Sequence, residues 1–456
     1  MTRAKEHYAI VGGGMLGLAL AWRLSGMGHR VTVLEAADHL GGLADAWRLG
    51  DITWDRHYHV TLLSDSYLRA ILKELDLDEQ MKWVQTRTGF YVDGRLYSMS
   101  SSLEFLKFAS LGLIDKFRLG WTIFRASRIK DWKALEQIPV ADWLCRLSGR
   151  RTFEKIWLPL LKAKLGEAYK ETSAAFIWAT IARMYAARRT GLKKEMFGYL
   201  PGGYARLLER FEERLMERGV TLCTNSVVDR VTRQDDGKLQ LVLNDGSHDV
   251  FDRVIITAPA NIAARIAPQL EPEEKSRLNS VKYLGIVCAS LLTSQPLGPY
   301  YVTNITDDWV PYTGVIEMTA LVDPQQFGGR SLIYLPKYAA ADDPVFAKSD
   351  DEIKQSCLAA LARMYPQFRP EDSVQAFRVS RVKQVFALST LGYSARVPPV
   401  TTSIPGLSIV TSAQIVNGTL NVNESVRLAE ESLPLVTAPL PLTTHHETHR
   451  QLVTRP

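Results

Sequence analysis

The sequence contains little cysteine and no long apolar run, and both absences restrict the class of protein it can encode. Its 456 residues include only four cysteines, which are widely scattered and form no Cys-x-x-Cys pair. This pattern excludes a disulfide framework, a structural zinc site and an iron–sulfur cradle, and it predicts a reducing, cytoplasmic compartment. No stretch of about 18 consecutive apolar residues occurs, so we expect no transmembrane helix.

The composition is that of an ordinary folded protein, but the charge is unevenly distributed. Hydrophobic residues make up 46% and charged residues 23% of the chain, and the length predicts two or three domains of about 150 residues each. Residues 101–200 hold 19 Lys and Arg against 9 Asp and Glu, a local net charge of +10, and five of the ten tryptophans. Such a segment is typical of a nucleic-acid surface, an anionic membrane surface or a funnel for an anionic substrate. It is equally typical of a solvated helical face above a tryptophan-containing core.

A glycine motif near the N-terminus lies in a strand–turn–helix pattern. Ala9–Val11 is typical of a short buried strand, Gly12, Gly14 and Gly17 form a G-x-G-x-x-G motif, and a helical pattern follows. A second strand pattern ends in Glu35, 18 positions after Gly17. Together these features predict a βαβ unit that binds a dinucleotide.

Each residue type has a physical role in such a site. Gly12 permits the tight turn, Gly14 lets a pyrophosphate approach the backbone, and Gly17 lets the helix pack close to the strand. The N-terminus of the helix presents free N–H groups to the phosphates. Glu35 can accept hydrogen bonds from an adenosine ribose, and its charge disfavours a 2′-phosphate and therefore NADP.

A second glycine pair follows, and here the sequence resembles a known family. The run Val33–Glu35, followed by Leu40, Gly41 and Gly42, resembles the glycine doublet of the FAD-dependent flavin amine oxidase superfamily. That superfamily includes monoamine oxidases, protoporphyrinogen oxidases and phytoene desaturases, with UDP-galactopyranose mutase as a more distant relative. A second glycine pair lets another stretch of backbone approach the long diphosphate–ribityl chain of FAD. The family usually has Arg after the doublet, where this chain has Leu43.

The resemblance extends to the C-terminal part of the chain. Tyr199–Gly203 resembles the family's Pro-Gly-Gly turn, Ser226–Val231 the strand that meets the adenine, and Asp252–Pro259 the strand that closes the FAD domain. Ile404–Val410 is typical of a strand, and a glycine-bearing loop leads from it to a helix at about 422–433, as at the end of the family's FAD domain. The resemblance implies that the following residues contact FAD: Gly12, Gly14, Met15, Leu16, Gly17, Glu35, Ala36, Gly41, Gly42, Leu43, Val228, Thr257, Asn417, Leu420 and Asn421.

The implied fold class is α/β, with a discontinuous Rossmann-like FAD-binding domain and an α+β substrate domain that carries a helical subdomain. The expected segments are 1–60, 200–275 and 395–435 for FAD, 61–199 and 276–394 for substrate, and 436–456 as a disordered tail. Monoamine oxidases tether their flavin through a cysteine near the C-terminus. Because no cysteine follows Cys357 here, the resemblance implies non-covalent FAD.

Two histidines are the candidates for chemistry beside the flavin. His57 and His59 follow a probable strand at Ala46–Ile52, in the segment that runs past the isoalloxazine ring in the family. Strand alternation predicts that both side chains point to the same side. Either could hydrogen-bond to flavin N5 or O4 or act as a proton shuttle, and the alternative is two satisfied histidines under a loop. No third ligand lies nearby in the sequence, so no metal site is expected.

The resemblance implies an FAD-dependent oxidoreductase that removes a hydride from a C–N or C–C bond of a small organic substrate. One alternative is a non-redox flavin isomerase, similar to the mutases, that acts on a sugar nucleotide or another anionic substrate. Another is a flavin-binding protein with a degenerate site. Residues 103–128 show an amphipathic helical pattern rich in basic residues, which is typical of peripheral contact with the inner face of a membrane. The pattern is equally typical of a cap over the active site or of a surface that binds an anionic group such as a pyrophosphate or a sugar nucleotide. No nucleic-acid partner is expected, and the sequence carries no signal for an oligomeric state.

Overall fold

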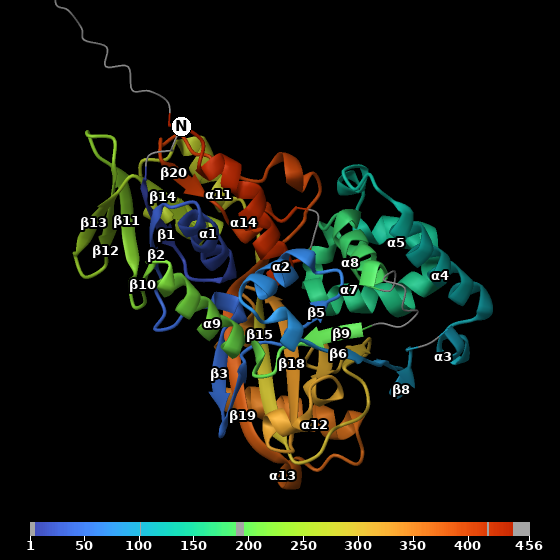
Figure 1. The fold of residues 1–456 in the computed structure, drawn as a ribbon. Coiled ribbons are helices and arrows are strands. Elements are labelled where there is room, and N and C mark those ends of the chain that lie inside the picture. Colours follow the sequence, from blue (N-terminus) through green and yellow to red (C-terminus); the bar gives the residue numbers. More distant parts are fainter. Residues whose placement is uncertain (1–4, 101, 188–195, 417–418, 441–456) are drawn as a thin grey trace, which may run out of the picture.

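A parallel sheet forms the centre of the half of the molecule that contains the N-terminus. The computed structural model describes residues 5–100, 102–187, 196–416 and 419–440. The sheet has five strands in the order β10-β2-β1-β14-β20, all parallel (Figure 1). The strands are β1 (His7–Val11), β2 (Arg30–Leu34), β10 (Thr221–Cys223), β14 (Arg253–Ile256) and β20 (Leu407–Ile409). They come from three separated stretches of the chain, and the predicted α/β fold around a parallel sheet is confirmed.

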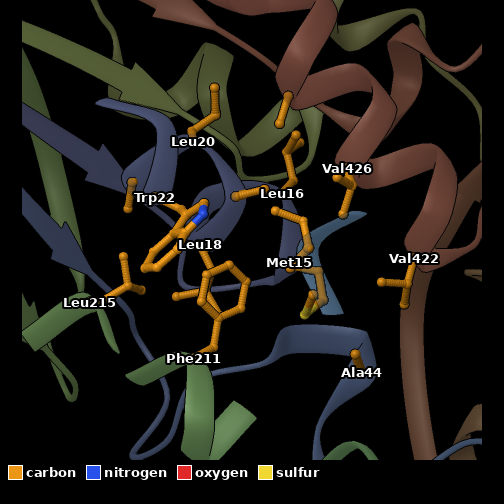
Figure 2. Packing of buried hydrophobic residues seen from close by; sticks show 14 of the residues in the cluster. Met15, Leu16, Leu18, Leu20, Trp22, Ala44, Phe211, Leu215, Val422 and Val426 are labelled. Carbon is orange, nitrogen blue, oxygen red and sulfur yellow. The ribbon is translucent and has the colours of Figure 1, made fainter. Parts of the chain in front are cut away.

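Helices cover this sheet and bury the first βαβ unit. Helix α1 (Met15–Gly26) packs between α14 (Val422–Val436) and α9 (Gly203–Glu217), so the start, middle and end of the chain share one core (Figure 2). Trp22 packs edge-on against Phe211, with ring centres 5.9 Å apart. Burial of α1 on almost all sides explains why its sequence is apolar around the whole helix.

An antiparallel meander lies between β10 and β14. Its strands are β11 (Val228–Arg233), β12 (Leu239–Leu243) and β13 (His248–Phe251), and a turn at Asp245 and Gly246 joins the last two. Helices α10 (Ala260–Ile266) and α11 (Pro272–Asn279) follow β14, and α10 packs with β11 in one apolar cluster.

A second, larger sheet occupies the other half of the molecule (Figure 1). It has seven strands in the order β19-β15-β18-β17-β16-β7-β8, antiparallel except where β16 pairs with β7. The strands are β7 (Thr88–Val92), β8 (Arg95–Ser98), β15 (Tyr283–Thr293), β16 (Val302–Ile305), β17 (Gly314–Glu317), β18 (Ser331–Ala340) and β19 (Val374–Ala387). Helices α12 (Asp350–Met364) and α13 (Pro370–Ser373) connect β18 to β19.

A helical region covers one end of this sheet and holds the basic segment. It comprises α3 (Ser102–Lys107), α4 (Leu113–Arg128), α5 (Val140–Ser148), α6 (Arg150–Thr152), α7 (Leu158–Leu165) and α8 (Ala174–Ala187). The amphipathic stretch expected over 103–128 is therefore two helices, separated at 108–112, where Phe108 and Leu111 turn into the core. Helix α2 (Ser66–Glu74) and a small sheet of β5 (Thr61–Leu62), β6 (Lys82–Gln85) and β9 (Met196–Tyr199) join this region to the nucleotide half.

The single strand expected at Ala46–Ile52 is wrong. The chain forms a hairpin of β3 (Ala46–Leu49) and β4 (Ile52–Asp55), because Gly50 adopts a positive φ of 62° and reverses the backbone. No strand continues past Asp55 into the histidine segment. Of the expected tail at 436–456, residues 441–456 lie outside the described residues, while Val436 ends α14.

Candidate cofactor site

The turn between β1 and α1 has the close packing that its glycines predict. Gly12 has a φ of 117°, and its N–H donates to the carbonyl of Leu34 at 2.8 Å. A Cβ on Gly12 would lie 2.4 Å from the Thr257 hydroxyl oxygen, and this hydroxyl donates to the carbonyls of Val11 and Gly12. A Cβ on Gly17 would lie 2.0 Å from the carbonyl oxygen of Gly12. Side chains at these positions would push α1 away from the sheet.

The second glycine pair lies directly against this first turn. The N–H of Gly41 donates to the carbonyl of Gly13 at 2.9 Å, and Gly41 forms an isolated parallel bridge with Gly14. A Cβ on Gly42 would lie 3.2 Å from the Cα of Gly14. Two bare backbone stretches therefore meet at the N-terminus of α1, next to Met15. This is a cradle of the kind that a diphosphate needs, and side chains would fill it.

Glu35 lies at the end of β2, beside both the cradle and the segment that precedes β11. One carboxylate oxygen accepts from the N–H of Gly13 at 2.7 Å and the other from the N–H of Ala37 at 2.9 Å. The backbone of Glu35 accepts from the N–H of Ser226 at 2.8 Å, two residues before Val228. Each carboxylate oxygen keeps further acceptor capacity, so Glu35 can also accept from an adenosine ribose. The expected contacts of Ala36 and Val228 with FAD stay predictions.

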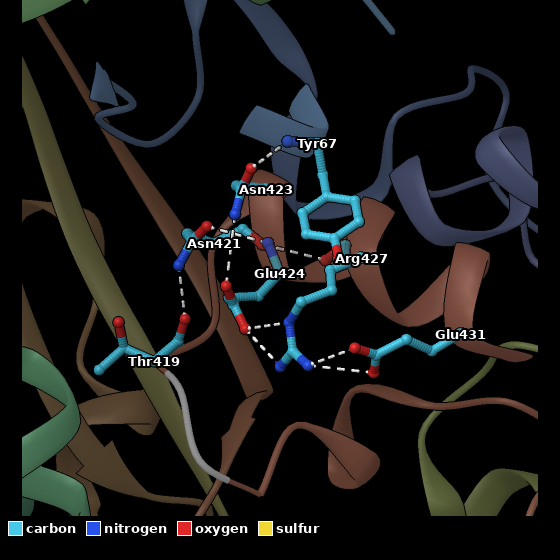
Figure 3. Close-up of polar contacts among 8 residues, drawn as sticks. Tyr67, Thr419, Asn421, Asn423, Glu424, Arg427 and Glu431 are labelled. Carbon is cyan, nitrogen blue, oxygen red and sulfur yellow. Dashed lines mark hydrogen bonds and ion pairs between the residues drawn. The ribbon is translucent and has the colours of Figure 1, made fainter. Parts of the chain in front are cut away.

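The third segment lies beside α1 at the start of α14, where Val422 shares one apolar core with Met15 (Figure 2). Asn421 is the N-cap: its side chain accepts from the N–H of Glu424 at 3.1 Å and donates to the carbonyl of Thr419 at 2.6 Å (Figure 3). Asn423 accepts from the N–H of Tyr67 at 3.0 Å and so fastens α14 to α2. The capped helix N-terminus places a positive dipole end beside α1.

The two remaining candidates on this segment have different outcomes. Leu420 is half-buried and packs against the apolar cores of both the nucleotide half and the helical region. Asn417 lies outside the described residues.

His57 connects the glycine doublet to the large sheet. Its ring nitrogens lie 3.4 Å from the carbonyl of Leu43 and 3.1 Å from the hydroxyl of Ser380 on β19. Burial lowers the pKa of His57 to about 3, with His59 and Arg56 adding to the effect. The ring is therefore neutral near pH 7, so it can donate or accept a hydrogen bond but does not gain a proton there.

His59 does not share the surroundings of His57, so the prediction that both rings point to one side is wrong. Its Nδ1 lies 3.7 Å from an oxygen of Asp55, and its ring lies 4.8 Å from that of Tyr204. His59 borders a cavity of about 20 Å³, which holds no more than a water molecule. The reason for the error is that residues 56–60 form no strand and do not alternate.

Beyond His57, the chain crosses the large sheet and meets residues that sequence reasoning missed. The hydroxyls of Tyr58 and Tyr338 lie 2.9 Å apart, and the backbone carbonyl of Asp55 accepts from the hydroxyl of Tyr334. The amine of Lys164 lies 3.3 Å from the centre of the Tyr338 ring. No local pattern could have joined these residues, because they lie on a loop, on β18 and on α7.

A wider cleft lies beside the helical region. It has a volume of about 340 Å³, and its lining includes Lys170, Glu171, Lys282, Leu388 and Tyr393. The Tyr393 hydroxyl donates to the carbonyl of Ala413 at 2.7 Å, which ties this wall to the loop after β20. The cleft therefore adjoins the segment that leads to α14.

In the described part of the chain, no group of three or more His, Cys, Asp or Glu side chains is arranged to hold a metal ion. None of the described helices is long and apolar enough to cross a membrane.

The sheet, the glycine cradle and Glu35 together define a dinucleotide-binding protein of the Rossmann type. Residues 16–410 match the family of flavin containing amine oxidoreductases, and the chain belongs to that family. It is therefore an FAD-dependent oxidoreductase, and the cradle formed by the two glycine turns fits the flavin dinucleotide that the family name implies.

Individual proteins give the same picture. Coproporphyrinogen III oxidase of Mycobacterium bovis is 25% identical over 374 residues, which cover 76% of this chain and 80% of that protein. Zeta-carotene desaturase of Synechocystis sp. is 25% identical over 413 residues, covering 78% and 82% respectively. The crystal structure of an oxidoreductase from Methanosarcina mazei superposes with a TM-score of 0.72 at 18% identity, and the match covers 94% of this chain and 99% of that chain. That last likeness concerns the fold.

Proposed function

We propose that this protein oxidises a C–N or C–C bond of a small organic molecule and that it holds its FAD without a covalent bond. The observation that carries the proposal is the meeting of two distant glycine turns, at Gly14 and Gly41, beside the core in which α14 packs on α1. The chain then continues from the second turn past His57 to Tyr58, which contacts β18. The residues along this path would hold the dinucleotide, and the substrate would bind over the large sheet.

The flavin, when bound, supplies the acceptor for a hydride, and the chain supplies orientation and electrostatics. The N–H groups at the start of α1 and the bare backbone at Gly14 and Gly41 hold the diphosphate. Glu35 accepts from the ribose. The N-terminal end of α14 stabilises negative charge. His57, neutral and fixed between Leu43 and Ser380, serves as a hydrogen-bonding group.

The cysteines support non-covalent binding. Cys288 is buried in β15 and Cys357 in α12, and burial raises the pKa of the Cys357 thiol to about 12. A thiol in this state is a poor nucleophile. Precipitation of the yellow protein with acid should release all flavin into the supernatant, whereas flavin retained in the pellet would contradict non-covalent binding.

The reaction type can be tested on the purified flavoprotein. Anaerobic mixing with amines, porphyrinogens and polyenes should bleach the oxidised flavin spectrum with one substrate class, and the product should contain one new double bond. If turnover instead requires prior reduction with dithionite and yields an isomer, the isomerase alternative is correct. A flavoprotein that is bleached by none of these and isomerises nothing contradicts both reactions.

We further propose that α3 and α4 contact an anionic membrane surface. On α4 the side chains of Leu113, Ile114 and Phe117 are 76%, 72% and 73% exposed, and Trp121 follows one turn later. Exposed basic residues flank them: Lys107, Arg118, Arg125 and Arg128. Exposed apolar side chains beside cations fit a surface of acyl chains and acidic headgroups.

Vesicle sedimentation tests this contact. The protein should pellet with phosphatidylserine-containing vesicles and less with pure phosphatidylcholine, and a double variant with Ile114→Ser and Phe117→Ser should remain in solution. Met216→Ser, which alters another exposed apolar residue on α9, is the matched control and should still pellet. Equal pelleting of the double variant and the control would contradict the contact.

A further inference from the structure

Lys164 lies where the helical region covers the large sheet. It belongs to the last turn of α7, which is fixed to the sheet because the Thr313 hydroxyl donates to the carbonyl of Ala163 at 2.9 Å. The Lys164 amine lies 3.3 Å from the centre of the Tyr338 ring and 5.3 Å from that of Phe386. The two rings are themselves in edge-to-face contact, 5.9 Å apart. The amine therefore faces an aromatic corner formed by β18 and β19.

This amine has no hydrogen bond and no ion pair among the residues that the structure describes. Neighbouring cations differ: Lys170 pairs with Glu167 at 2.7 Å, and Lys282 pairs with Glu171. Lys164 is half-buried overall, and desolvation lowers its pKa to about 7. An ammonium group that is withdrawn from water without a counter-charge is unfavourable, and a nearby aromatic ring offsets only part of that cost. The described part of the chain therefore supplies no counter-charge for the Lys164 amine.

We propose that Lys164 recognises a carboxylate group of the substrate, whose apolar body packs against Tyr338 and Phe386. A carboxylate restores the missing counter-charge through a charge-assisted hydrogen bond. The aromatic faces beside the amine favour an apolar or aromatic skeleton. This assignment rests on the proposed function, because it places the substrate over the large sheet, next to the Tyr58–Tyr338 hydroxyl pair.

A nearby cleft and the positive charge of the surrounding sequence segment both suit an anionic substrate. Leu388, which lines the cleft of about 340 Å³, lies two residues after Phe386, and both side chains belong to one apolar cluster. Residues 101–200, the sequence segment that contains Lys164, carry a net charge of +10, which favours anionic ligands. Two further lysines, Lys170 and Lys282, line the cleft, and both are paired with glutamates.

Binding of benzoate to the flavin-loaded protein tests the proposal without requiring turnover. Benzoate combines a carboxylate with an aromatic ring, and benzamide has nearly the same shape without the charge. Titration calorimetry and perturbation of the flavin spectrum measure the two affinities. The dissociation constant for benzoate should be at least about ten times lower than that for benzamide. Lys164→Met should weaken benzoate binding about tenfold or more and leave benzamide binding unchanged, while Lys164→Arg should restore part of the affinity for benzoate.

Lys162→Met is the matched control, because Lys162 is exposed on the same helix. Its benzoate affinity should equal that of the unaltered protein. No preference of the unaltered protein for benzoate over benzamide, or equal benzoate affinity in the Lys164→Met and Lys162→Met proteins, would overturn the role of Lys164. A protein that carries no flavin and cannot be loaded with FAD would instead overturn the proposed function, so the two failures are distinguishable. If Lys164→Met does not fold, the benzoate–benzamide comparison and Lys164→Arg still decide the matter.

Discussion

Gly17→Ala tests how rigidly the nucleotide turn is built. The new Cβ would lie 2.0 Å from the Gly12 carbonyl oxygen, whereas ordinary contact begins at 3.4 Å, a shortfall of 3.4 − 2.0 = 1.4 Å. The opposing atom belongs to the backbone and cannot rotate away, so α1 must move. Overpacking of this kind costs about 3 kcal/mol at the upper end, and replacing a helical glycine returns about 1 kcal/mol, which leaves a net loss of about 2 kcal/mol.

The assay has two readouts, and its control variant is expected to raise stability where Gly17→Ala lowers it. The urea midpoint of the flavin-free protein, followed by tryptophan fluorescence, should fall, and FAD affinity should weaken about tenfold because the helix N-terminus leaves the cradle. Gly120→Ala in α4 meets nothing within 4 Å, so it should raise stability by up to about 1 kcal/mol. An unchanged midpoint together with unchanged FAD affinity in Gly17→Ala would refute the packing derived for this turn.

Three further changes have expected outcomes. Asn421→Ala removes the N-cap of α14 and should cost about 1 kcal/mol of unfolding free energy, while Asn421→Asp, which keeps the acceptor, should cost less; equal losses in urea denaturation would contradict the cap. The pKa of His57 falls from 6.5 to about 3 on folding, so the unfolded chain binds more protons between these values and stability is lost as the pH falls below 6.5. His57→Gln should flatten the thermal stability profile between pH 6.5 and 4, and an unaltered slope would contradict a buried neutral imidazole. Arg253→Met should cost about 3 kcal/mol, because the buried guanidinium pairs with Glu6 at 3.0 Å and donates to the carbonyls of Val436 and Ala438; a shift in the urea midpoint equivalent to less than about 1 kcal/mol would show that these contacts contribute little.

The nucleotide half could be predicted from the sequence because its constraints are local. A turn that brings backbone against backbone tolerates only glycine, and the spacing of Gly12, Gly14 and Gly17 before an acidic residue has few other uses. The Gly41–Gly42 pair carried the resemblance to the flavin amine oxidases for the same reason. The strand and helix patterns on either side of this turn then predicted the βαβ unit of the parallel sheet.

Only the tertiary structure decided which residues surround the two histidines and Lys164. His57 and His59 are two residues apart, yet one meets Ser380 and the other Asp55 and Tyr204, because a loop has no fixed period. Lys164 and Tyr338 lie on α7 and β18, and no local signal marks their contact. A glycine turn can be predicted from neighbouring residues, because steric exclusion allows only glycine there. The residues around a pocket depend on how distant elements pack, and that packing is a property of the whole fold.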